Sequence, residues 1–161
     1  MQVGIYAFAT ANGLRPDELA REVEARGFTR LMFPEHSHIP ISRATSYPEV
    51  YGGGALPDFY RETFDPFVSC TLAASATTRL RVGTGICLLA LREPVNTAKE
   101  VASVDYLSNG RFDFGVGFGW MWVQVLEIAG QLPGGLTRAN LLIAMRATEM
   151  TAPMYLEGIK W

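Results

Sequence analysis

Four short β-prone segments alternate with helix-like segments, and this alternation restricts the possible folds more than any other feature of the sequence. The β-prone segments lie at 3–9, 28–33, 80–91 and 111–116. Each intervening stretch is long enough to hold a helix that returns the chain to the start of a parallel neighbouring strand. A repeated strand–helix order is typical of α/β proteins with a parallel sheet.

Helices are predicted at 15–27, 65–76, 93–107 and 136–150. The second and third begin with Asp65-Pro66 and Glu93-Pro94, which place a proline at the first helical position. The third ends at Ser108-Asn109-Gly110, a typical stop signal. Arg111, just beyond this stop, is expected to form a structural ion pair or a loop clamp.

The connections between these elements are unequal in length. Each helix leads into the next strand over a few residues, whereas the connections from strand to helix are long and carry the unusual residues. The longest is 35–63, and a loop of this length in a compact domain is usually functional or mobile. This asymmetry predicts a barrel or a doubly wound sheet that binds its ligand at the carboxyl ends of the strands.

Composition excludes several classes of protein. The chain has 161 residues, 48% hydrophobic content and a net charge of -2, which indicate one globular domain with no tendency to bind nucleic acid or an anionic membrane. Cys70 and Cys87 lie in apolar segments without metal-ligand spacing, so we expect reduced, buried thiols. No signal peptide or membrane-spanning run is recognisable, and we expect a cytoplasmic protein.

His36 and His38 both follow the second predicted strand, on the expected ligand face. A histidine there can exchange a proton near neutral pH, and Glu35 is placed to orient His36. The alternative is a loop histidine that bonds to the backbone. No third ligand accompanies the two imidazoles, so no metal site is predicted.

Two glycine-containing segments end the third and fourth strands. Gly83 and Gly85 flank Thr84 and indicate a β-bulge or a close approach of a ligand, or alternatively glycines that pack against a neighbouring helix. The segment Gly115-Val-Gly-Phe-Gly119 does not satisfy the GxGxxG pattern of dinucleotide sites. The aromatic rings of Trp120 and Trp122 either stack on a ligand ring or cover the core.

Together these segments resemble the luciferase-like family of flavin and deazaflavin oxidoreductases, most closely its branch that uses coenzyme F(420). The resemblance rests on motifs in the same order as in the family: Phe33-Pro-Glu-His-Ser-His-Ile-Pro40, Arg81-Val-Gly-Thr-Gly-Ile86, Arg92-Glu-Pro94, Ala98-Lys-Glu-Val-Ala102, Asp105-Tyr-Leu-Ser-Asn-Gly-Arg111 and Gly115-Val-Gly-Phe-Gly-Trp120. The resemblance implies a (β/α)8 barrel.

The resemblance also implies roles for single residues. Glu35 and His36 would lie beside the reactive ring of the cofactor, as the catalytic pair. Thr84, Gly85 and Ile86 would form the bulge behind that ring, which the family often builds with a non-prolyl cis peptide. The remaining cofactor contacts implied are Gly117, Gly119 and Trp120. Coenzyme F(420) is the expected cofactor and FMN the alternative, for hydride transfer or for monooxygenation of a small organic substrate.

The chain carries about four of the eight βα units of such a barrel. We therefore expect residues 1–161 to form the N-terminal half of a luciferase-like barrel, with the resemblance strong over 1–120 and weak beyond it. Open strand edges favour a homo-oligomer. Two alternatives are a truncated, non-catalytic half-barrel that self-associates without cofactor, and a nucleotide-binding domain that uses the 115–119 loop.

Overall fold

The structure, a computed structural model, describes residues 3–37, 39, 47, 49 and 52–117. Four parallel strands form one sheet in the order β1-β2-β3-β4. The strands are β1 (Gly4–Tyr6), β2 (Arg30–Phe33), β3 (Arg81–Leu88) and β4 (Phe112–Gly117). This confirms the predicted α/β class and the parallel sheet.

Three helices connect these four strands. Two short 3-10 helices lie in the connections that lead from the carboxyl end of a strand to the next helix. The helices are α1 (Pro16–Ala25), α2 (Pro66–Ser75) and α3 (Pro94–Leu107), and the 3-10 helices are η2 (Asp58–Tyr60) and η3 (Leu89–Leu91). The helix predicted at 136–150 lies outside the described residues. Among the described residues, no helix is long and apolar enough to span a membrane.

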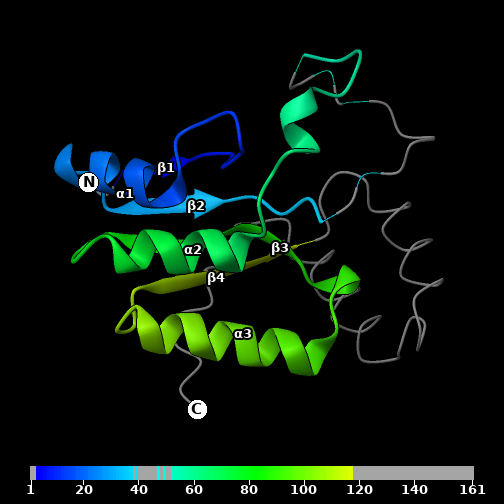
Figure 1. Cartoon of the computed structure of the whole chain (residues 1–161). Helices are drawn as coiled ribbons and strands as arrows, with labels where there is room; N and C mark the ends of the chain where they lie inside the picture. Colours follow the sequence, from blue (N-terminus) through cyan, green and yellow to red (C-terminus); the bar gives the residue numbers. More distant parts are fainter. Residues whose placement is uncertain (1–2, 38, 40–46, 48, 50–51, 118–161) are drawn as a thin grey trace.

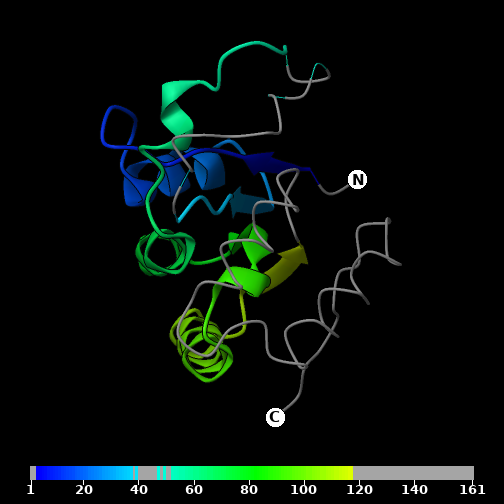
Figure 2. The ribbon, with the colours of Figure 1, turned by 90° about the vertical axis from the view of Figure 1, so that its right-hand side faces the viewer.

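All three helices cover the same face of the sheet (Figures 1 and 2). The core lies between these two layers because alternate strand side chains point toward the helices. Leu31 and Phe33 of β2 and Val82 of β3 are almost fully buried there, against Phe67 and Cys70 of α2. Sheet and helices are thus arranged like one half of a barrel wall, with the helices outside.

The helix ends follow the predicted signals. The Asp65 carboxylate accepts the N–H groups of Phe67 and Val68, at 2.9 and 3.1 Å, and so caps the start of α2. Gly27 ends α1 with a φ of 80°, a left-handed conformation that favours glycine.

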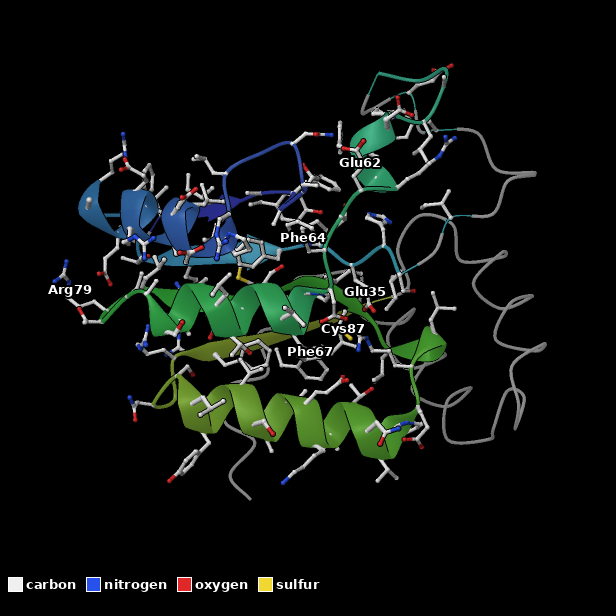
Figure 3. All side chains as sticks on the ribbon, in the orientation of Figure 1. Glu35, Glu62, Phe64, Phe67, Arg79 and Cys87 are labelled. Carbon is white, nitrogen blue, oxygen red and sulfur yellow. The ribbon has the colours of Figure 1, made fainter. Side chains whose placement is uncertain are left out.

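The amino ends of the strands are held by two side-chain clamps. Glu24 of α1 accepts the N–H groups of Thr78, Arg79 and Leu80 at the start of β3, with a shortest distance of 2.7 Å. Arg111 donates to the carbonyl oxygens of Ala74 (2.9 Å) and Leu80 (2.7 Å), which confirms the loop clamp predicted for it. Figure 3 shows Arg79 at the end of the sheet opposite Glu35.

Candidate active site

His36 lies just beyond the carboxyl end of β2, between aromatic rings from two other segments. Its ring is stacked on Phe8, which follows β1, with centroids 5.9 Å apart and an interplanar angle of 10°. The ring of Tyr60, in η2, meets it edge-on at 4.7 Å. The long connection from β2 to α2 therefore folds back on itself, so that Tyr60 near its end packs against His36 near its start.

The surroundings of His36 favour an uncharged imidazole. Burial lowers the pKa of His36 to about 4, because the charged form loses its hydration there. Its Nδ1 atom is buried and has no hydrogen-bond partner among the described residues. The predicted alternative, in which a backbone bond satisfies the histidine, therefore does not account for this atom. A buried nitrogen without a partner is available to a ligand.

Glu35 contacts β3 instead of His36. Its side chain is 1% exposed and accepts the N–H of Leu88 at 2.5 Å and the Nε of Arg92 at 2.6 Å. Figure 3 shows Glu35 beside Cys87, near the carboxyl ends of the strands. No contact between the Glu35 carboxylate and the His36 ring occurs among the described residues, so the orienting role expected of this side chain is not a direct one. Its assignment to the catalytic pair stays a prediction.

Arg92 is the residue of this region whose role sequence reasoning missed. Its guanidinium lies over the ring of Phe67, 4.6 Å from the centroid, and donates to carboxylates of Glu35, Asp65 and Glu100. Burial by itself would lower the pKa of Arg92, but the charges of Glu35 and Asp65 raise it above its usual value. Arg92 thus stays charged and joins four segments of the chain.

The end of β3 carries the predicted bulge. The ladder with β4 is irregular between Thr84 and Cys87, and the Gly85–Ile86 peptide is cis, as the family resemblance implies. The Thr84 hydroxyl donates to the carbonyl of Gly115 at 2.7 Å and accepts its N–H at 3.0 Å. In this structure the hydroxyl of Thr84 therefore connects the two strands.

Close approach between strands explains the glycines here. A Cβ at Gly85 would lie 3.1 Å from the Cβ of Met32 and 3.2 Å from the ring of Tyr6. A Cβ at Gly117 would overlap the Cδ1 of Ile86. The atoms that require glycine thus come from strands, not from a neighbouring helix. Tyr6 also contacts Phe8 at a centroid distance of 5.7 Å, so a row of aromatic rings leads from Gly85 to His36.

Four predicted positions, His38, Gly119, Trp120 and Trp122, lie outside the described residues. The others fall into two groups at the same end of the sheet: His36 with its aromatic neighbours, and Thr84, Gly85 and Ile86 with Gly117. Within the described ranges, no cluster of three or more His, Cys, Asp or Glu side chains is arranged to bind a metal.

Comparison with known proteins gives a consistent result. The model of the family described as luciferase-like monooxygenase matches residues 9–135. An uncharacterized protein of Mycobacterium tuberculosis is 38% identical over 151 residues, which are 91% of this chain and 52% of that protein. The chain therefore spans about half the length of this relative.

Solved structures share the fold, and two of them illustrate the range of cofactors. Coenzyme F(420)-dependent tetrahydromethanopterin reductase from Methanopyrus kandleri is 24% identical with a TM-score of 0.53, over 82% of this chain and 30% of that one. The oxygenating constituent of 3,6-diketocamphane monooxygenase from Pseudomonas putida, in complex with FMN, is 19% identical with a TM-score of 0.59, over 100% of this chain and 42% of that one. At these identities the likeness concerns the fold of a luciferase-like barrel, of which this chain matches a part.

Proposed function

The chain belongs to the luciferase-like monooxygenase family, and on that premise we propose that it takes part in a flavin- or deazaflavin-dependent oxidation or reduction of a small organic substrate. The observation that carries the proposal is His36. Just beyond the carboxyl end of β2, where parallel α/β folds bind their ligands, it offers a buried nitrogen that has no partner in the part of the chain that the structure describes. Coenzyme F(420) is the first candidate for the cofactor and FMN the second.

The residues on this edge fit a flat ring system. The backbone at Gly85 and Gly117 is free of side chains and follows the bulge of β3, and Tyr6 and Phe8 provide apolar ring faces beside it. A bound deazaflavin supplies hydride transfer, and a bound flavin also supplies oxygen activation.

The contribution of this chain is positional. His36 is uncharged above a pH of about 4, and its Nδ1 atom is placed to form a hydrogen bond with a ligand. The apolar rings of Phe8 and Tyr60 hold the imidazole in place and limit the access of water. Deprotonated and shielded, His36 is suited to form a hydrogen bond with a bound ligand, because an imidazole with a pKa of about 4 stays uncharged but is a weak proton acceptor at neutral pH.

A binding titration tests the proposal. Coenzyme F(420) and FMN are each added to purified protein while cofactor fluorescence is followed, with His36→Ala as the test variant. Arg79→Ala, at the opposite end of the sheet, is the matched control. We expect His36→Ala to weaken binding at least about tenfold and Arg79→Ala to leave it unchanged. Binding of neither cofactor to the wild-type chain, or tighter binding of ATP or NAD, contradicts the proposal.

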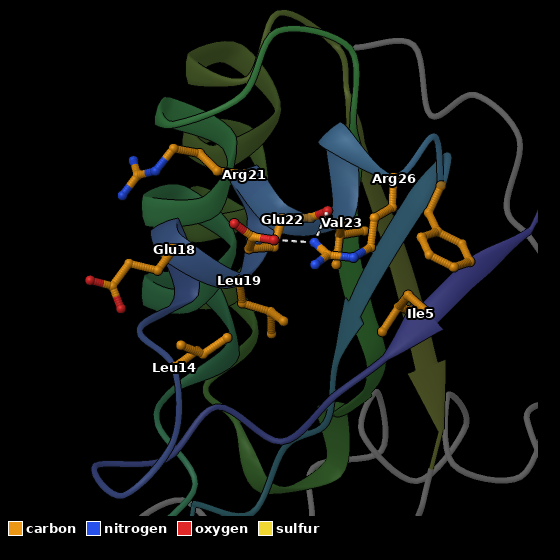
Figure 4. Close-up of a pocket in the computed structure, with 9 residues that line it drawn as sticks. Ile5, Leu14, Glu18, Leu19, Arg21, Glu22, Val23 and Arg26 are labelled. Carbon is orange, nitrogen blue, oxygen red and sulfur yellow. Dashed lines mark hydrogen bonds and ion pairs between the residues drawn. The ribbon is translucent and has the colours of Figure 1, made fainter.

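A second candidate function is self-association without cofactor. Within the described part of the chain, β1 and β4 each pair with only one strand, so two sheet edges are open. Beside β1 lies an open groove of about 800 Å³ (Figure 4). Its lining combines the apolar side chains Ile5, Leu14, Leu19, Val23 and Phe28 with the charged side chains Glu18, Arg21, Glu22 and Arg26. Open parallel edges beside this partly apolar groove favour a second copy of this chain as the partner.

Sedimentation velocity over a range of concentrations tests this candidate. Leu14 is 54% exposed, so Leu14→Glu places a charge in the groove without disturbing the core. Tyr106→Glu, 83% exposed on α3, is the matched control. We expect a wild-type dimer that dissociates in Leu14→Glu and persists in Tyr106→Glu. A wild-type chain that sediments as a monomer at every concentration removes this candidate.

A further inference from the structure

Arg92 connects the carboxyl ends of two strands to two helices. Its Nε bonds to Glu35 after β2 at 2.6 Å, its Nη2 to Asp65 at the start of α2 at 2.6 Å, and its Nη1 to Glu100 in α3 at 2.9 Å. Arg92 itself follows β3 and η3. Each nitrogen of the planar guanidinium thus has a carboxylate of its own, an arrangement that lysine cannot reproduce.

The three carboxylates depend on Arg92 to different degrees. Asp65 and Glu100 have side chains that are 43% exposed, so water screens them, and Asp65 is also held by helix N–H groups. The Glu35 side chain is 1% exposed, and Arg92 is its counter-charge. A buried carboxylate is costly without such a partner. Arg92 and Glu35 are therefore a mutually dependent pair.

The other oxygen of Glu35 connects β2 to β3 directly. It accepts the N–H of Leu88, the last residue of β3, at 2.5 Å. Leu88 lies two residues after Ile86 of the cis peptide, and Glu35 immediately precedes His36. One carboxylate therefore holds the backbone on both sides of the candidate site.

We propose that Glu35 and Arg92 are positioning residues, which fix the carboxyl ends of β2 and β3 to each other and thereby set where the His36 ring lies relative to the Gly85–Ile86 turn. The role proposed for these two side chains involves no contact with the substrate. The pair acts through the backbone next to His36, while Phe8 and Tyr60 hold the ring itself. The catalytic meaning of this placement rests on the proposed function.

A pair of matched variants separates positioning from general stabilisation. Glu24→Gln replaces the carboxylate that accepts N–H groups at the amino end of β3. Glu35→Gln replaces the carboxylate that accepts the N–H of Leu88 at the carboxyl end of β3. Both substitutions keep the shape of the side chain and remove its charge. Loss of stability is expected in both, so stability alone does not test the proposal.

The decisive measurement is the NMR signal of the His36 ring carbon-bound protons in the full chain. The sequence has two histidines, and His38→Gln assigns their signals. The neighbouring rings of Phe8 and Tyr60 displace the wild-type His36 signals from those of an exposed histidine. We expect Glu35→Gln to move these signals toward the exposed position and Glu24→Gln to leave them unchanged. Unchanged signals in a folded Glu35→Gln variant overturn the proposal.

Arg92→Lys decides the outcome if Glu35→Gln does not fold. The lysine keeps the positive charge but cannot bond to three carboxylates at once. Displaced His36 signals support the positioning role, and unchanged signals overturn it.

Titrations of the same variants with FMN and with coenzyme F(420) connect placement to binding. We expect at least about tenfold weaker binding in Glu35→Gln and no change in Glu24→Gln. If the wild-type chain binds neither cofactor, the proposed function fails, while the His36 signals still decide whether Glu35 and Arg92 position the ring.

Discussion

His36 combines a half-buried ring with a buried Nδ1 atom that has no hydrogen-bond partner among the described residues, and this combination makes its protonation state a property of the fold. In the unfolded chain the imidazole regains water and its ordinary pKa of 6.5. The folded protein therefore resists protonation of this residue over a range of pH in which an exposed histidine is charged. Because the pKa of His36 differs between the folded and the unfolded chain, lowering the pH lowers the free energy of unfolding.

The first prediction concerns stability at acid pH. Since the folded pKa of about 4 lies below 6.5, the unfolded state binds the proton first as the pH falls. The stability that neutral His36 provides is complete above pH 6.5 and is lost between pH 6.5 and 4. In urea unfolding at pH 7 and 4.5, we expect the wild type to lose about 2 kcal/mol more than His36→Gln, a figure reduced for the partial exposure of the ring. Equal losses would contradict the low pKa.

The second prediction concerns the hydroxyl of Thr84. Thr84→Val keeps the shape of the side chain but removes both hydrogen bonds to the backbone of Gly115. We expect the free energy of unfolding to fall by about 1–3 kcal/mol, because two polar backbone groups lose a partner. Thr84→Ser, which keeps the hydroxyl, is the control. If the two variants unfold alike in urea, the hydroxyl does not connect the strands.

Single residues also show where sequence reasoning reached its limit. The His36 loop and the cis Gly85–Ile86 peptide follow from local motifs and their family resemblance, because both lie within a few adjacent residues. The pairing of Glu35 with Arg92 joins residues 57 positions apart, and the contact of Tyr60 with His36 depends on how a long loop folds back. Nothing in the local sequence encodes such partners. A buried acid and a distant arginine are recognised as a pair only once the sheet is assembled.

At the scale of whole elements, α2 occupies the centre of the helical layer, and the residue that caps its start serves two functions. Asp65 accepts N–H groups from the first turn with one oxygen and bonds to Arg92 with the other. The start of α2 is thereby connected to the end of β3. We expect loss of the cap and loss of the ion pair to lower the free energy of unfolding by different amounts.

The third prediction separates these two contributions. Asp65→Asn retains a good N-cap but loses the charge that faces Arg92, whereas Asp65→Ala loses both. Because the ion pair is partly exposed, we expect a small loss of stability in Asp65→Asn and a further loss of about 1–2 kcal/mol in Asp65→Ala. Urea unfolding of the three proteins measures both steps. A loss in Asp65→Asn as large as that in Asp65→Ala would assign the stabilisation to the ion pair.

The bounds of the elements were predictable where proline, glycine or a capping side chain marks them. The predicted helix at 93–107 agrees with α3 (Pro94–Leu107), since Glu93 caps its start and Asn109 and Gly110 end it with positive φ angles. The first strand is shorter than the predicted 3–9, because β1 pairs with β2 only over Gly4–Tyr6. The 3-10 helix η2 was not predicted, since its Asp-Phe-Tyr sequence carries no local signal.

At the scale of the whole molecule, the alternation of strands and helices was sufficient to predict the α/β class. The alternation alone did not predict which strands lie at the centre of the sheet and which lie at its edges. β2 and β3 have strand neighbours on both sides, whereas β1 and β4 are each bonded on one side within the described residues. Backbone groups at an edge exchange with solvent more readily than those at the centre.

The fourth prediction is a gradient of hydrogen exchange across the sheet. We expect the slowest amide exchange in β2 and β3 and faster exchange in β1 and β4, measured by mass spectrometry on a dilute sample. If a second copy covers the edges, raising the protein concentration slows exchange in β1 and β4 and leaves β2 unchanged. Equally slow exchange in all four strands of the dilute sample would contradict open edges.

The four strands lie side by side in the order in which they occur along the chain. During synthesis each strand after the first therefore emerges beside a partner that the ribosome has already released. The sheet can grow by one strand and one covering helix at a time, from the N-terminal end of the chain. For this topology the direction of translation is also the direction of assembly.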